Sequence, residues 1–560
     1  MQKKSTLLKS PFKILAVVVM LFTANHISAQ TVITISDDDL MTDTYNWTSD
    51  NVYLLDGFVF LEAGGMLNIE PGTVIKGKAS PTTGDNASAL IITVGAQICA
   101  GGTAESPIIF TSEIDNVDDP SDLIATDRGL WGGVIILGDG VLGNSSVTAN
   151  IEGIPTTETR AVFGGTNNSN NAGFMRYVSI RHGGAELAPG DEINGLTLGG
   201  VGDSTIIEHV EVFSNSDDGI EFFGGAVNVK YATIAFCGDD AFDWDLGWVG
   251  NGQFWFVIQG DDDADNGGEW DGAKPDENMI FSNPTVYNAT FIGSGSGASA
   301  SNTNAILMRD ATGGTVANSI FTDYANKAIE IEDLPSASGI DSYQRMEDGD
   351  INLLNNIWYG FGANSTLDAD PSTGVIRFTS SGDDPTCVAL ISHLTNNDNS
   401  LTDPMLEGIS RFPNAQLDPR PESGSPAIDD LAAYPGGGFF TDVTYKGAFN
   451  PQGTLWNAGW TALDEYGYLA NTVGIEDFVQ QIAVDIYPNP ARDNVTIEFA
   501  QNRGELVRVE LTDIQGKVLQ TVERMAASKL VMDVNNLDTG IYLIRVSTET
   551  GEAVQKIIVE

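Results

Sequence analysis

Acidic side chains recur at a spacing of 22 residues near the middle of this chain. The pairs related by this spacing are Asp217 with Asp239, Asp218 with Asp240, and Glu221 with Asp243. If each repeat stacks on the next as parallel strands, the members of a pair lie about 5 Å apart. Two carboxylates at that distance repel by roughly 1 kcal/mol in water and roughly 3 kcal/mol at an effective dielectric constant of 20. Turn amides, a shared proton or a cation must offset this repulsion.

Three interpretations of these acidic columns stay open at the level of sequence. The Asp side chains can cap turns, since Asp accepts hydrogen bonds from nearby backbone N–H groups. Asp217 and Asp239 can instead ligate Ca²⁺, which prefers oxygen donors. In the third interpretation the chain is an enzyme and a carboxylate pair acts on a glycosidic bond. The catalytic candidates are then Asp218, Glu221, Asp240 and Asp243.

A second acidic segment, residues 261–269, resembles the start of a calcium-binding loop. Asp261, Asp263 and Asp265 stand at positions 1, 3 and 5. The segment departs from an EF-hand, because the glycine falls one place late and Gly272 replaces the glutamate of position 12. We therefore expect either a local calcium site or a solvated acidic loop.

Four tryptophans follow the acidic repeat closely. They are Trp244, Trp248, Trp255 and Trp270. Aromatic rings beside carboxylates are typical of sugar-binding grooves, so these residues are the candidate ligand-binding set. The other interpretation, that these large side chains fill the interior of the repeats, is the favoured one.

The elements that position these residues are short strands in a repeating coil. Val178/Ile180, Val210/Val212 and Ala232/Ile234 form one inward column, and Leu196/Leu198, Ile220/Phe222 and Phe242/Trp244 form another. A further repeat, at a spacing of 23, relates residues 304–310 to 327–333. Repeats of this length indicate a solenoid, in which each unit buries its apolar face against its neighbours. We predict an all-β chain whose body is a right-handed parallel β-helix.

Charge and composition limit the partners and the compartment. The net charge is −50, and the acidic excess lies in the body, which disfavours nucleic acid and anionic membranes. Residues 1–29 read as a signal peptide, with a basic start, a short apolar run and small residues at the cleavage position. No later transmembrane segment is expected. The three cysteines, Cys99, Cys237 and Cys387, are predicted to be free thiols.

The predicted domains follow from changes in pattern along the chain. Residues 30–465 form the β-helix body, and a Pro-rich stretch from about 400 is expected to cap its open end. Residues 466–482 read as a linker. Regularly spaced short strands from residue 483 to 560 predict a small Ig-like antiparallel β-sandwich.

This C-terminal segment carries a family resemblance. Its motifs are Tyr487-Pro488-Asn489-Pro490, Asp513-Ile514-Gln515-Gly516-Lys517, Leu537-Asp538-Thr539-Gly540-Ile541-Tyr542 and Gln555-Lys556-Ile557-Ile558. The segment resembles the type A C-terminal sorting domain of the type IX secretion system of Bacteroidota. The resemblance implies recognition of residues 483–560 by that machinery, followed by release or attachment at the outer-membrane surface.

The body resembles secreted right-handed β-helix proteins of the same bacteria, through segments such as Glu70-Pro71-Gly72-Thr73 and Asp217-Asp218-Gly219-Ile220. Asp217-Asp218-Gly219 also resembles part of a polygalacturonase site, but no Gly-His-Gly or Arg-x-Lys motif follows. Lyases of this fold use Lys or Arg as a base near calcium, which makes Arg181 a further catalytic candidate.

The sequence therefore favours a binding protein over an enzyme. We expect a secreted or cell-surface β-helix that binds glycan or extracellular matrix, with Ca²⁺ stabilisation. The alternative is a polysaccharide lyase or glycoside hydrolase that acts on the acidic face.

Overall fold

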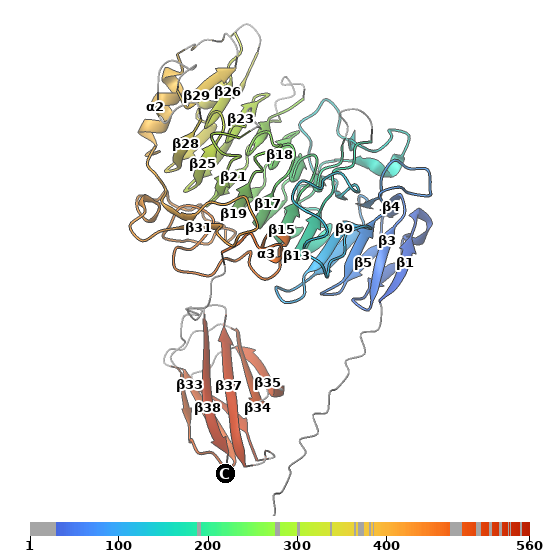
Figure 1. The fold of residues 1–560 in the computed structure, drawn as a ribbon, viewed down its shortest axis with the longest axis vertical. Helices are drawn as coiled ribbons and strands as arrows, with labels where there is room; N and C mark the ends of the chain where they lie inside the picture. The colour runs from blue at the N-terminus through green and yellow to red at the C-terminus, as the bar shows by residue number, and fades with distance from the viewer. Residues whose placement is uncertain are drawn as a thin grey trace, which may run out of the picture.

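The computed structural model (Figure 1) contains a body of stacked coils and a smaller C-terminal sandwich. It describes residues 30–187, 192–274, 280–298, 303–335, 339–362, 366–367, 374–379, 382, 384, 386–470, 484–499, 506–513, 518–525, 529–535, 537, 539–548 and 551–559. The expected signal peptide, residues 1–29, lies outside these residues.

One side of the body is a sheet of ten strands, all paired in parallel. Its strands are β4 (Phe58–Leu61), β7 (Ala89–Ile92), β10 (Val134–Leu137), β14 (Leu196–Gly199), β16 (Ile220–Phe223), β18 (Phe242–Asp245), β20 (Glu269–Asp271), β23 (Ile306–Arg309), β26 (Ile329–Glu332) and β29 (Ile376–Thr379). The predicted register is confirmed, because Glu221 pairs with Asp243 and Ile220 with Phe242. Each coil therefore adds one short strand to this sheet, as a parallel β-helix requires.

The other sides belong to a sheet of seventeen strands. Its strands are β1 (Thr31–Ile35), β2 (Thr44–Trp47), β3 (Asn51–Leu55), β5 (Met66–Ile69), β6 (Val74–Gly77), β8 (Gln97–Gly101), β9 (Ile108–Ser112), β13 (Gly173–Arg181), β15 (Ile206–Phe213), β17 (Asn228–Ala235), β19 (Asn251–Ile258), β21 (Thr285–Tyr287), β22 (Thr290–Ile292), β24 (Gly314–Ala317), β25 (Ile320–Tyr324), β27 (Ile351–Leu354) and β28 (Ile357–Phe361). The strands in the middle of this sheet are long enough to pair with two shorter strands of a neighbouring coil. β13 pairs with both β8 and β9, and β19 pairs with both β21 and β22.

A column of residues in the left-handed conformation bends this sheet. Tyr177, His209, Tyr231 and Phe254 have φ between 50° and 58°, and asparagines continue the column in later coils. The first four rings stack on one another, with centroids 4.4–4.9 Å apart. A left-handed backbone conformation is strained for a residue with an aromatic side chain. The stacking of the rings and their packing must therefore stabilise this bend of the sheet.

The interior of the coils is the main hydrophobic core, and both predicted inward columns lie in it. The core also contains Trp244, Trp248, Trp255 and Trp270, each at most 1% exposed. Trp244 stacks on Trp270 with ring centroids 4.0 Å apart. The expectation that these four tryptophans form a sugar-binding surface is therefore wrong. Strand alternation places Trp244, Trp255 and Trp270 beside the aliphatic column, and Trp248, which follows β18, stacks on Phe222 in the same core.

The C-terminal part of the body does not close the end of the coil as expected. Helix α2 (Val388–Asn396) packs Leu390 and Leu394 against the core at that end. Residues 401–470, which we call the strap, instead run back along the seventeen-stranded sheet. Asn318 accepts a hydrogen bond from the Ala432 N–H, and far upstream the Glu211 carboxylate accepts the Ala462 N–H at 2.6 Å.

The strap also moves the expected domain boundary. Tyr468 and Leu469 are buried in its contact with the coil, so the body extends to residue 470. The rest of the expected linker, 471–482, lies outside the described residues.

The C-terminal segment is the antiparallel β-sandwich that its spacing predicts. One sheet contains β32 (Val484–Tyr487), β33 (Asn494–Phe499) and β36 (Lys529–Asp533), and the other contains β34 (Leu506–Asp513), β35 (Val518–Met525), β37 (Gly540–Thr548) and β38 (Gly551–Val559). Apolar residues of both sheets form its separate core. All three cysteines are free, and only Cys99 is partly exposed. Among the described residues, no helix has the length and apolar character needed to cross a membrane.

Candidate functional site

The acidic columns meet on the outer face of the ten-stranded sheet. Glu221 and Asp243 are outward residues of β16 and β18, as are Phe223 and Asp245, while Ile220 and Phe222 point into the core. The turns before these strands supply the Asp pairs at 217–218 and 239–240. Consecutive coils therefore bring together carboxylates that the spacing of 22 residues relates in sequence.

These side chains line an open cavity of about 510 Å³. Its lining residues are Glu152, Glu192, Asn194, Asp217, Asp218, Glu221, Phe223, Asp239, Asp240, Asp243, Asp245, Asp265, Glu269 and Lys274. Four overlapping carboxylate triplets place one oxygen of each member within 4.8 Å of the others. They are Asp217/Asp218/Asp239, Asp218/Glu221/Asp243, Asp239/Asp240/Asp265 and Asp240/Asp243/Glu269. We call this lined surface the acidic cavity.

Some carboxylate oxygens of the acidic cavity are hydrogen-bonded within the coil. Asp218 Oδ1 accepts the Asp240 N–H at 2.9 Å, and Asp240 Oδ1 accepts the Asn266 N–H. Each Asp thus fixes the turn of the following coil, which confirms the turn-capping expectation for these two residues. Hydrogen bonds of this kind leave the second oxygen of each carboxylate for another partner.

Two buried oxygens in the acidic cavity have no hydrogen-bond partner within the part of the chain that the structure describes. One is Asp243 Oδ1, and the other is Oδ1 of Asn194, a residue only 1% exposed. The Asn194 amide nitrogen donates to Glu221, which leaves its carbonyl oxygen as a free acceptor. A buried acceptor without a partner costs free energy, about 1–3 kcal/mol. Such an acceptor is completed by a donor, a water molecule or a cation.

Burial and mutual repulsion disfavour the ionised carboxylates. Burial first, and then neighbouring carboxylates, raise the pKa values of Asp218, Glu221, Asp240 and Asp243 well above the ordinary range. The same causes raise the pKa of Asp217 to about 7. Burial raises the pKa of Glu269 to about 7 against the attraction of Arg309. Without a metal ion, the positive charge around these carboxyl groups is therefore too small to offset their burial and mutual repulsion.

Basic side chains occupy one end of the acidic cavity only. Lys274 pairs with Asp245 at 2.9 Å and with Asp271 at 3.2 Å. Arg309 pairs with Asp271 at 3.0 Å and with Glu269. Lys274 is the one basic residue among the described residues that line the acidic cavity. Arg309 reaches the triplet of Asp240, Asp243 and Glu269 through Glu269, while the two triplets that contain Asp218 have no ion pair among the described residues.

Arg181 does not reach the acidic cavity. It is buried on the seventeen-stranded sheet, where it pairs with Glu465 of the strap at 2.9 Å. The expectation of Arg181 as a base beside the acidic columns is wrong, because β13 points this side chain under the strap.

The acidic loop is divided by the fold. Asp265 lines the acidic cavity, but Asp261 and Asp263 are exposed and are not part of its lining. Neither Asp261 nor Asp263 belongs to the carboxylate triplets, and the local calcium loop with ligands at positions 1, 3 and 5 stays a prediction. Asp262, between them, pairs with Arg128 at 2.8 Å.

Several lining residues were not identified from the sequence. Glu152, Glu192, Asn194 and Lys274 lie in segments that lack the spacing of 22 residues. The repeat does contain a signal for Asn194. It stands two residues before the inward Leu196, just as Asp218 stands two residues before Ile220 and Asp240 two residues before Phe242. Glu152 has no such relation to the repeat.

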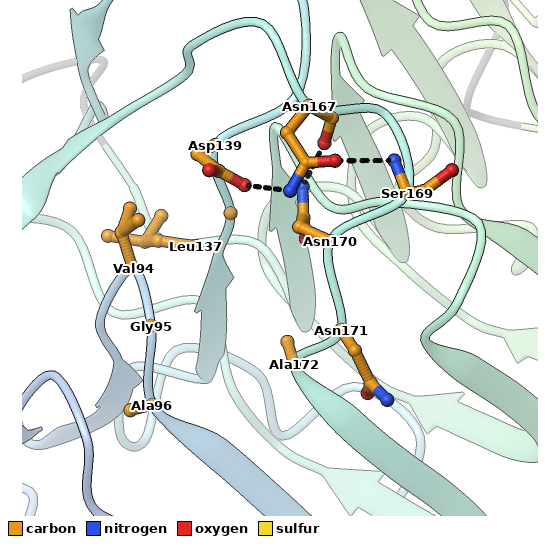
Figure 2. A pocket seen from close by; sticks show the side chains of 11 residues that line it. Val94, Gly95, Ala96, Leu137, Asp139, Asn167, Ser169, Asn170, Asn171 and Ala172 are labelled. Atoms are coloured by element: carbon orange, nitrogen blue, oxygen red, sulfur yellow. Dashed lines mark hydrogen bonds between the residues drawn. The ribbon is translucent and has the colours of Figure 1, made fainter.

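A smaller hollow of about 330 Å³ lies beside β10, between residues 94–96 and 167–172 (Figure 2). Its amide side chains serve the local loop. Asn167 accepts the Ser169 N–H and donates to Asp139, and Asn170 donates to the Asn167 carbonyl oxygen. These contacts hold the loop that forms one wall of the hollow.

The coil with its acidic face and the separate sandwich define a parallel β-helix protein with a C-terminal β-sandwich domain. Residues 39–376 match the family described as a pectate-lyase-like beta helix domain, which covers more than half of the chain. The chain belongs to this family. Residues 485–560 match the secretion system C-terminal sorting domain. This tail implies recognition by the type IX machinery, export to a secreted or surface location, and an origin in Bacteroidota. No curated protein matches the chain.

Proposed function

We propose that the body is a secreted, calcium-stabilised binding module that holds glycan or extracellular matrix at the acidic cavity. The observation that carries the calcium proposal is the pair of buried oxygens on Asn194 and Asp243 that have no partner among the described residues, in the cavity that the carboxylate triplets line. Oxygen atoms without donors, next to uncompensated negative charge, are the surroundings that a divalent cation stabilises.

The donor chemistry supports calcium over other divalent metals. Carboxylate and amide oxygens line the acidic cavity, and its described lining contains no His or Cys. Zinc favours nitrogen and sulfur ligands, and Mg²⁺ demands a compact octahedron and keeps several waters. Ca²⁺ accepts six to eight oxygens in flexible geometry, which suits a wide surface of carboxylates.

The position of the ligands suggests what calcium does. The triplets join Asp217 and Asp218 of one coil to Asp239 and Asp240 of the next, and then to Asp265. A cation there links successive coils and removes the repulsion along the column. The loaded site also presents a partly unsatisfied cation to solvent, which sugar hydroxyl or carboxylate oxygens can ligate.

Calorimetry and thermal melting of the secreted protein test this proposal. We expect Ca²⁺ to bind the EDTA-treated protein and to raise its melting temperature, with a weaker response to Mg²⁺ at the same ionic strength. A melting temperature that is the same in Ca²⁺ and in chelator would refute it. Glycan arrays with and without Ca²⁺ then test the binding partner.

Polysaccharide cleavage is the second candidate function. In its favour, the oxygens of Asp218, Glu221 and Asp243 lie within 4.8 Å of one another, and their raised pKa values suit a general acid. A lyase base is less well supported, because ion pairs with Asp245 and Asp271 outweigh burial and raise the pKa of Lys274. Release of new chain ends from a polysaccharide panel, abolished in Asp243→Asn, would favour the enzyme.

A further inference from the structure

A separate hollow of about 500 Å³ lies between the seventeen-stranded sheet and the strap. Its floor is formed by Thr322 of β25 and Tyr359 of β28, which pair directly in register. Strap residues between 403 and 409, with Glu422, form the opposite wall. The volume lies within the range of small-molecule sites, about 300–1,000 Å³.

The hollow combines an aromatic ring with exposed apolar side chains. Tyr359 is partly exposed, and across from it Met405 and Ile409 are 37% and 39% exposed. Large apolar side chains left this open at a concave site are available to a ligand rather than used by the fold. A sugar ring has apolar C–H faces that pack on such a surface.

Polar groups of the hollow are also available. Thr322 is only 3% exposed, yet its hydroxyl makes no hydrogen bond with the described residues. The Glu422 carboxylate likewise has no ion pair or hydrogen bond among them. Asp323, by contrast, is held by Arg411 at 2.8 Å. A hydroxyl that is nearly buried and unpartnered in a cavity needs a ligand or water to complete it.

Gly360 keeps the Thr322 hydroxyl accessible. Its φ is 76°, and a Cβ atom there would lie 3.5 Å from Thr322 Oγ1. A longer side chain at this position would lie over the hydroxyl. The floor therefore stays open where the buried polar group faces the hollow.

We propose that this hollow binds one unit of a neutral glycan, with its apolar face on Tyr359 and its hydroxyls on Thr322 and Glu422. The carboxylates that line the hollow are those of Asp323, Asp403 and Glu422. Carboxylates accept hydrogen bonds from sugar hydroxyls and repel uronic acids. The site lies on a different sheet from the acidic cavity and contains none of its residues, so its binding does not depend on calcium.

Binding of neutral hexasaccharides of glucose, mannose and xylose to the secreted protein in EDTA tests the site, with hexagalacturonate and hexalysine as charged comparators. We expect at least one neutral sugar to bind. Tyr359→Leu should weaken it about tenfold, and Thr322→Val and Glu422→Gln about three- to tenfold, from the ordinary energies of stacking and hydrogen bonds.

Two substitutions outside the hollow serve as matched controls. Phe412→Leu removes an exposed aromatic ring of the same strap, and Thr44→Val removes an exposed hydroxyl of β2. Both should leave the affinity unchanged. Glu422 is partly exposed, so Glu422→Gln should fold. The affinity of this variant tests the site if Tyr359→Leu fails to fold. No binding of any neutral sugar, tighter binding of either charged comparator, or binding unaffected by Glu422→Gln would overturn the proposal.

Discussion

Asp218 Oδ1 accepts the backbone N–H of Asp240 at 2.9 Å, and so joins two consecutive coils. The same contact recurs one coil later, between Asp240 and Asn266. Turn capping and cation binding are thus compatible in this chain, because each carboxylate has a second oxygen. The fold holds the acidic residues in place through one atom and directs the rest of their charge into the acidic cavity.

Asp243→Asn should have opposite effects with and without calcium. In chelator, burial and the neighbouring carboxylates oppose the ionisation of Asp243, and Asn does not incur this cost, so we expect the free energy of unfolding to rise by about 1–3 kcal/mol. In Ca²⁺ the substitution should reduce both the affinity and the melting-temperature shift. Urea denaturation in the two conditions measures this. Asp118→Asn, at an exposed position, should change neither, and a loss of metal-free stability in Asp243→Asn would contradict the expectation.

The metal-free protein should become less stable as the pH rises from about 4 to 7. The pKa values of Asp217 and Glu269 are raised to about 7, and that of Asp265 to about 6. In this range the folded state binds more protons than the unfolded state, so stability is lost as the pH passes through the folded pKa values. Saturating Ca²⁺, which binds the ionised form, should weaken this dependence. Unfolding free energies at pH 5 and pH 8, in EDTA and in Ca²⁺, provide the check. Equal unfolding free energies at pH 5 and pH 8 in EDTA would contradict the expected repulsion between the ionised carboxylates.

Glu211→Ala should release the strap. The Glu211 carboxylate is fully buried, accepts the Ala462 and Leu463 N–H groups at 2.6 and 3.0 Å, and lies near buried Arg181. Removing it leaves buried donors without an acceptor, at a cost of about 3–5 kcal/mol. Limited proteolysis should then cut within 401–470 sooner than in the wild type. Glu347→Ala, at an exposed site on α1 (Ser342–Glu347), is the control and should not alter the pattern.

Trp244→Ala should damage stability but not ligand binding. Trp244 is fully buried and stacks on Trp270. The substitution leaves a cavity in the core and should lower the free energy of unfolding by about 3–5 kcal/mol. At temperatures where the variant stays folded, its calcium and glycan affinities should match the wild type. The reverse result, lost glycan binding with unchanged unfolding, would return a sugar-binding role to this tryptophan.

The spacing of 22 residues determined much of the body without the structure. In a parallel coil, residues one repeat apart become direct neighbours, so the pairing of Glu221 with Asp243 follows from their positions in the sequence. The inward columns follow from the alternation of each strand. The same alternation places Trp244 in line with Phe222, and so already favoured a core position for it over a surface one. The sorting tail follows from local motifs and regular strand spacing.

Only the tertiary structure decided which residues outside the repeat join the site. Glu152 and Lys274 come from segments outside the repeat, and the Lys274 N–H donates to the Gly143 carbonyl oxygen, a contact between residues 131 positions apart. Arg181 and Glu211 are covered by a strap more than 250 residues later in the chain, which local patterns do not encode. The sequence by itself determined the coil and the stacked charge, because both depend on short periods. The cavity, the covered arginine and the hollow at Thr322 depend on long-range packing, which only the folded chain decides.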